Sequence, residues 1–106
     1  MIARVQAGIT SVDELYDVLT EALHLPGYFG RNWDALADVL RDLSWLAPRQ
    51  IAIIHADLPD VPAEELRVYL DVLRMAVDDW VQRPGDHVLV VAFPEAEQLA
   101  IRRLLT

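Results

Sequence analysis

Three short apolar segments, separated by stretches with helical periodicity, constrain the fold of this chain most strongly. The segments are residues 2–5, 50–54 and 87–93. The last is the longest β-branched run of the chain, and we expect it to be a buried strand. A strand that is apolar on both faces, as 50–54 is, is typical of the interior of a parallel sheet. The alternation of strands and helices therefore predicts an α/β fold, with a small, three-stranded parallel sheet packed against helices.

Four helices are expected around these strands. Apolar side chains recur at helical spacing in four segments: residues 12–24, the segment after Asn32, residues 63–81 and residues 95–105. In the third helix we expect Tyr69 and Trp80 at the margins of the buried stripe. In the closing helix we expect Leu99 and Leu104 to face inward. A turn at Pro84-Gly85 is predicted before the last strand.

Length and composition favour one domain over residues 1–106, because 54% hydrophobic residues in 106 support a single core. The absence of cysteine excludes disulfides and thiolate metal sites. No apolar run is long enough for a membrane span, and the N-terminus lacks the layout of a signal peptide. We therefore expect a cytoplasmic protein without membrane contact, monomeric when free.

The charge pattern favours a basic protein as partner. Seventeen acidic residues against nine arginines give a formal net charge of −8, which would repel a nucleic acid backbone. The same charge would attract a basic protein and accelerate the encounter. Solubility alone also explains an acidic surface, so the charge does not decide the function.

Candidate catalytic and metal-binding residues are few. His24, His55 and His87 have no spacing that suits zinc, and four glycines provide no phosphate-binding loop. No serine has the small neighbours of a nucleophile elbow. We expect no cofactor, no metal and no enzymatic activity.

The most informative segment runs from Leu25 to Asp38, with the sequence LPGYFGRNWDALAD. Asn32 is a good helix cap, and the carboxylates of Asp34 and Asp38 follow at i and i+4, where they repel each other by a few tenths of a kcal/mol. The aromatic residues Tyr28, Phe29 and Trp33 surround these acids. Aromatic side chains beside charge are typical of a protein-binding surface, although Phe29 and Trp33 can equally fold under the helix.

This segment resembles the barstar family of bacterial ribonuclease inhibitors, whose pattern is Leu-Pro-x-Tyr-Tyr/Phe-Gly-x-Asn-x-Asp-Ala-Leu-x-Asp. The order of strands and helices is also similar to that family through about Phe93, with the closing helix from Glu95 as an addition. The resemblance implies an intracellular inhibitor that plugs the active site of a small, basic, secreted ribonuclease.

The resemblance also implies partner-binding residues. Asp38 matches the family's dominant binding carboxylate, and Asp34 matches a second acid that faces cationic groups of the enzyme. Tyr28 matches an aromatic residue that packs on the catalytic histidine. The predicted partner-binding set is Tyr28, Phe29, Gly30, Asn32, Trp33, Asp34, Asp38 and Asp79.

Three positions depart from the best-known member of the family. Ala37 replaces a tryptophan, for which Trp33 is expected to compensate from one turn earlier. Arg31 replaces an acid and brings a positive charge into the loop. Met75 stands at the position of a third binding carboxylate, with Asp79 one turn further on. Such peripheral changes fit an inhibitor adapted to a different toxin.

Two other functions remain open on the sequence alone. The same scaffold can serve as an immunity or regulatory protein for a basic partner that is not a ribonuclease. A hydrolase built on Asp34, Asp38 and a histidine is the other alternative, but nothing in the sequence places a histidine near these acids. We expect an inhibitor of a barnase-type endoribonuclease.

Overall fold

The parallel sheet forms as predicted, with the strand that is apolar on both faces at its centre. The computed structural model describes residues 1–83 and 85–106. Strands β1 (Ile2–Val5), β2 (Gln50–His55) and β3 (Val88–Ala92) are arranged in the order β1-β2-β3, and both pairs are parallel. Ile2 pairs with Ala52, and Ala52 pairs with Val90. A turn was predicted at Pro84-Gly85, and Pro84 lies outside the described residues.

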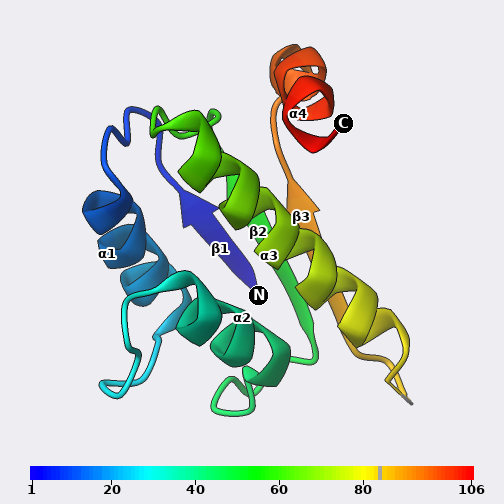
Figure 1. Ribbon diagram of the computed structural model, residues 1–106. Coiled ribbons are helices and arrows are strands. Elements are labelled where there is room, and N and C mark those ends of the chain that lie inside the picture. Colours follow the sequence, from blue (N-terminus) through cyan, green and yellow to red (C-terminus); the bar gives the residue numbers. More distant parts are fainter. Residues whose placement is uncertain (84) are drawn as a thin grey trace.

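The helices that connect the strands lie on one face of the sheet. Figure 1 shows α1 (Val12–Leu23), α2 (Trp33–Asp42) and α3 (Ala63–Val81) on the same side. Parallel strands joined in spatial order by right-handed crossovers require this arrangement. The other face stays open, so Val88 and Val90 of β3 are 44% and 46% exposed while Leu89 between them is buried. The prediction that 87–93 is a buried strand is therefore wrong for one of its faces.

The long helix α3 has the predicted bounds but is more deeply buried than the sequence indicated. Tyr69 and Trp80, expected at the margins, are 0% and 3% exposed. The indole N–H of Trp80 donates to the carbonyl of Leu40 at 2.9 Å, and the Tyr69 hydroxyl is bonded to His55 at 2.6 Å. Both rings can be buried because each polar atom has a partner.

The segment after β3 is a short 3₁₀ turn, Glu95–Glu97, followed by helix α4 (Gln98–Leu105), where the sequence predicted one helix over 95–105. Helix α4 packs against α3, and Arg67 donates to the carbonyl of Leu104 at 3.0 Å. Ile101 and Leu104 face the core, as expected for Leu104, but Leu99 is 60% exposed. Leu99 lies two residues before Ile101, so on a helix the two side chains point in different directions.

Within the described residues, no helix combines the length and the apolar character needed to cross a membrane.

Candidate functional site

Helix α2 begins at the cap that the sequence predicted. Asn32 has extended backbone, and its Oδ1 accepts a hydrogen bond from the N–H of Ala35 at 2.8 Å. Its Nδ2 donates to the carbonyl of Gly30 at 3.3 Å. A Cβ added to Gly30 would lie 3.4 Å from both the Cβ of Ala35 and the Nδ2 of Asn32. Asn32 thus joins the loop to the helix at a point with little spare room.

The two predicted site carboxylates of α2, Asp34 and Asp38, are at the surface, while Leu36, Val39 and Leu40 of the helix are buried in the core. Asp38 accepts a hydrogen bond from Arg41 at 3.1 Å, and its side chain is still 77% exposed. Among the residues that the structure describes, Asp34 has no side-chain hydrogen bond or ion pair. Exposed ion pairs contribute only about 0–1 kcal/mol, so both carboxylates remain accessible to a cationic partner.

The loop before α2 separates two consecutive aromatic side chains. Tyr28 is 74% exposed, whereas Phe29 is buried and packs edge-on against Tyr16 of α1, with ring centroids 5.7 Å apart. The N–H of Phe29 also donates to the carbonyl of Pro26 at 2.9 Å. Phe29 therefore anchors the loop from below, and Tyr28 is left at the surface.

Trp33, at the first position of α2, packs inward. Its ring centroid lies 5.2 Å from that of Tyr16 and 5.7 Å from that of Tyr69. Its indole N–H donates to Oε2 of Glu65 on α3 at 2.6 Å. Of the two roles that the sequence left open for Trp33 and Phe29, the structure shows both side chains packed beneath the loop and helix. Trp33 joins α1, α2 and α3 at the base of the site.

Asp79, the predicted site residue on α3, is partly exposed. Its side chain is 46% exposed and accepts a hydrogen bond from Arg83 at 2.9 Å. The next residue, Trp80, is bonded to Leu40, so this end of α3 lies against α2. Met75, one turn earlier, is 55% exposed. Asp79 is therefore a partly exposed acid with one ion pair, at the end of α3 that packs against α2.

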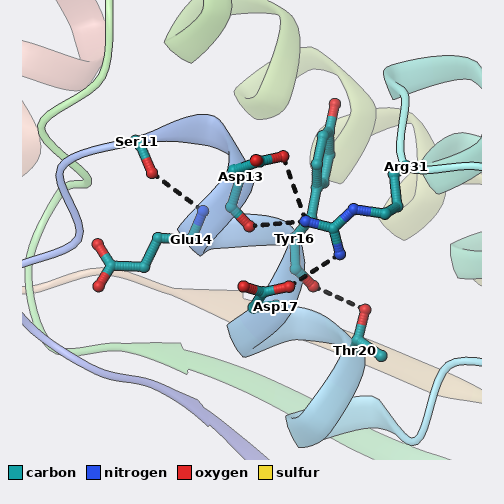
Figure 2. Close-up of polar contacts among 7 residues, drawn as sticks. All are labelled: Ser11, Asp13, Glu14, Tyr16, Asp17, Thr20 and Arg31. Atoms are coloured by element: carbon teal, nitrogen blue, oxygen red, sulfur yellow. Dashed lines mark hydrogen bonds and ion pairs between the residues drawn. The ribbon is translucent and has the colours of Figure 1, made fainter.

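Arg31 is the site residue whose contacts sequence reasoning missed. Its φ of 51° is in the left-handed region, which costs a residue other than glycine about 1–2 kcal/mol. Figure 2 shows its guanidinium against α1: one nitrogen donates to Asp17 at 2.9 Å, the other to the carboxylate and the carbonyl of Asp13 at 3.2 and 3.1 Å. The hydrogen bond that Arg31 donates to Asp17, and then the one that it donates to Asp13, raise the pKa of Arg31.

A signal for this contact was present in the sequence. Asp13 and Asp17 are at positions i and i+4, so on a helix they share a face and repel each other unless a cation lies between them. Arg31 supplies that cation from a distant part of the chain.

His55 of β2 and Tyr69 of α3 form a buried polar pair between the sheet and the helices that cover it. The Nδ1 of His55 lies 3.1 Å from the carbonyl of Ala92, which only accepts, so Nδ1 carries the proton and Nε2 accepts from the Tyr69 hydroxyl. The imidazole also stacks on the ring of Phe93, with ring centroids 3.9 Å apart. Burial lowers the pKa of His55 to about 4, against a smaller opposing effect of the Ala92 hydrogen bond and Asp57, and burial raises the pKa of Tyr69.

This pair belongs to the core and not to the candidate site. His55 is 2% exposed and neutral near pH 7, so it lacks access to a substrate. In the described part of the chain, no group of three or more histidine, cysteine, aspartate or glutamate side chains is arranged to hold a metal ion.

The candidate site consists of exposed acids and an exposed tyrosine above packed aromatic side chains. A protein-family model described as Barstar (barnase inhibitor) matches residues 2–92, which is most of the chain. The chain therefore belongs to the barstar family. The match runs from β1 to the end of β3, and α4 lies beyond it. A comparison with curated proteins found no match.

Proposed function

We propose that this protein inhibits a barnase-type ribonuclease by occupying its active site with α2 and the preceding loop. The observation that carries the proposal is the placement of Asp34 and Asp38 at the surface of a helix whose other face is fixed in the core. Their carboxylates can replace RNA phosphates in charge-assisted hydrogen bonds with cationic groups of the enzyme. Because the helix is already ordered, little conformational entropy is lost on binding.

The remaining predicted residues have distinct parts in this proposal. Tyr28, Gly30 and Asn32 provide the exposed loop, and Asp79 provides a peripheral acid on α3. Phe29 and Trp33 support these residues from beneath. Ala37 and Met75 adapt the periphery to a particular ribonuclease.

The ion pair between Arg41 and Asp38 is compatible with this role. Both side chains are exposed, at 43% and 77%, so the pair is weak and Arg41 can release the carboxylate to the enzyme. The net charge of −8 would attract a basic enzyme, and screening by salt would slow the association. We further propose that the protein acts as a monomer in the cytoplasm.

The test is RNA cleavage by barnase as the purified protein is titrated in, with Asp38→Ala in parallel. We expect stoichiometric inhibition by the wild type, weaker at high salt. The inhibition constant should rise at least about a hundredfold in Asp38→Ala, because the enzyme's buried cationic groups would lose their partner.

Asp42→Ala is the matched control, because it removes an equal charge one turn further along the same helix. We expect it to change the inhibition constant by less than about threefold, because the family pattern assigns binding carboxylates to Asp34 and Asp38 and ends before residue 42. Absence of inhibition, or equal inhibition by wild type and Asp38→Ala, would contradict the proposal.

A further inference from the structure

The loop of residues 27–32 is attached to α1 by two kinds of contact, one apolar and one charged. The apolar contact centres on Tyr16, which packs against Phe29 at 5.7 Å and against Trp33 at 5.2 Å between ring centroids. These two residues stand on either side of Arg31 in the sequence. One buried tyrosine of α1 therefore contacts the chain at two points, one on each side of Arg31.

The charged contact lies between these two points in the sequence. Three hydrogen bonds join the Arg31 guanidinium to Asp13 and Asp17, and its central carbon lies 5.6 Å from the centroid of the Tyr16 ring (Figure 2). The two loop neighbours of Arg31, Gly30 and Asn32, are exposed. Arg31 is thus the side chain that ties the exposed middle of the loop to a helix formed much earlier in the chain.

The backbone of Arg31 indicates that this contact holds the loop in an unusual conformation. Its φ of 51° is unfavourable for arginine, and such a conformation persists where the surrounding contacts enforce it. The adjacent glycine, Gly30, does not take the left-handed conformation. In this conformation the Arg31 side chain makes three hydrogen bonds to α1 and lies over the Tyr16 ring.

The pairing also changes the charge that the loop presents. Arg31 is the only lysine or arginine between Leu25 and Asp34, and an unpaired guanidinium there would repel a basic enzyme. Asp13 and Asp17 place two negative charges beside the positive charge of Arg31. Their side chains are still 88% and 71% exposed, so the cluster as a whole is acidic toward solvent.

We propose that Arg31 is a positioning residue, which fastens the loop to α1 through Asp13 and Asp17 and removes its own positive charge from the surface that faces the ribonuclease. The proposal rests on the proposed function, because the loop it orders presents Tyr28 and leads into the acids of α2. It explains how the loop of an inhibitor for a basic enzyme accommodates an arginine.

The first experiment measures loop order in the free protein. Backbone amide order parameters of residues 27–31 are compared in wild type, Arg31→Gln and Asp13→Ala/Asp17→Ala, which removes both carboxylates that pair with Arg31. We expect values near 0.85 in the wild type to fall below about 0.6 in both variants. The urea midpoint should stay the same, because the aromatic anchor of Tyr16 remains.

Matched controls separate the contact from the loss of charge. Glu21→Gln removes one acid from α1 one turn beyond Asp17, and Arg74→Gln removes an exposed arginine with a single ion pair on α3. We expect both controls to keep the order parameters of the wild type. Unchanged loop order in Arg31→Gln would overturn the proposal.

The second experiment measures binding to barnase. We expect dissociation about tenfold faster in Arg31→Gln and in Asp13→Ala/Asp17→Ala, because the loop must be ordered on binding. Adding Arg31→Gln to Asp13→Ala/Asp17→Ala should change the dissociation rate by less than about twofold, since both changes break the same contact. Arg31→Lys should recover part of the loss, because a lysine can pair with one of the two acids.

The two experiments distinguish the possible failures. If Arg31→Gln weakens barnase binding and Asp13→Ala/Asp17→Ala does not, Arg31 contacts the enzyme directly and the positioning role is wrong. If wild type fails to inhibit barnase but the variants lose loop order, the proposed function fails, while the attachment of the loop by Arg31 is supported.

Discussion

The buried pair of His55 and Tyr69 and the exposed carboxylates of α2 are two polar regions of opposite design. In the core, both nitrogens of His55 and the hydroxyl of Tyr69 have hydrogen-bond partners. On α2, Asp34 has no side-chain partner within the described residues, and Asp38 has one exposed arginine. Polar atoms in the core are matched to each other, whereas those of α2 are left available.

This difference separates stability from binding. An unpaired polar atom is costly in the core, because water cannot reach it, and costs almost nothing at the surface. We therefore expect changes in the core pair to alter the free energy of unfolding, and changes at the α2 acids to alter partner binding with little effect on folding. The following predictions test this division, in order of decreasing effect on stability.

Acidification should destabilise the protein through His55. Its pKa is about 4 in the folded protein and 6.5 in the unfolded chain, so the unfolded state binds more protons between these values. The free energy of unfolding should therefore fall as the pH falls through this window, by about 2 kcal/mol between pH 7 and pH 5. Urea unfolding at the two pH values measures the change.

His55→Gln provides the comparison, because glutamine does not titrate and keeps a hydrogen-bonding side chain at this position. The variant is expected to be less stable at pH 7 and to lose much less stability on acidification. An equal loss in His55→Gln and wild type would show that other groups cause the pH dependence.

Removal of the Tyr69 hydroxyl should have the next largest effect. Tyr69→Phe leaves Nε2 of His55 buried without a donor, which should cost about 1–2 kcal/mol in the free energy of unfolding at pH 7. Tyr16→Phe is the control, because Tyr16 is also buried but its hydroxyl has no hydrogen bond within the described residues. We expect Tyr16→Phe to lower the free energy of unfolding by less than about 0.5 kcal/mol. Similar losses in both variants would contradict the role of the pair.

The cap of α2 should contribute less than the core pair. Asn32→Ala removes the hydrogen bond to the N–H of Ala35, with an expected loss of about 1 kcal/mol. Asn32→Ser restores a capping oxygen and should recover most of the loss. If serine is no better than alanine, the stabilising contact is the one from Nδ2 to Gly30 and not the cap.

The local features of both regions could be predicted from the sequence. The bounds of α3, residues 63–81, follow from Pro62 and the apolar periodicity, and the Asn32 cap follows from residue type and position. The exposure of Asp34 and Asp38 follows from the same periodicity. These features depend on neighbours within a few residues, and for these the sequence pattern is sufficient.

The features that were missed depend on partners far apart in the chain. The burial of Tyr69 requires His55, that of Trp80 requires the carbonyl of Leu40, and Arg31 lies 14 residues beyond Asp17. The open face of β3 follows from the direction in which the chain crosses the sheet. Periodicity identifies which side chains are apolar, but it does not say which polar atom is available to meet an indole, a phenol or a guanidinium.

The smallest expected change in stability belongs to the variant with the largest expected effect on binding. Asp38→Ala removes the repulsion by Asp34 and raises helix propensity, but it also removes the ion pair with Arg41. Since these contributions are each a few tenths of a kcal/mol and of opposite sign, the free energy of unfolding should change by less than about 0.5 kcal/mol. Urea unfolding of this variant, beside its barnase inhibition, checks the division directly. If the free energy of unfolding fell by more than about 1 kcal/mol, Asp38 would be needed for folding. Weaker inhibition by Asp38→Ala would then not be evidence that Asp38 contacts the enzyme.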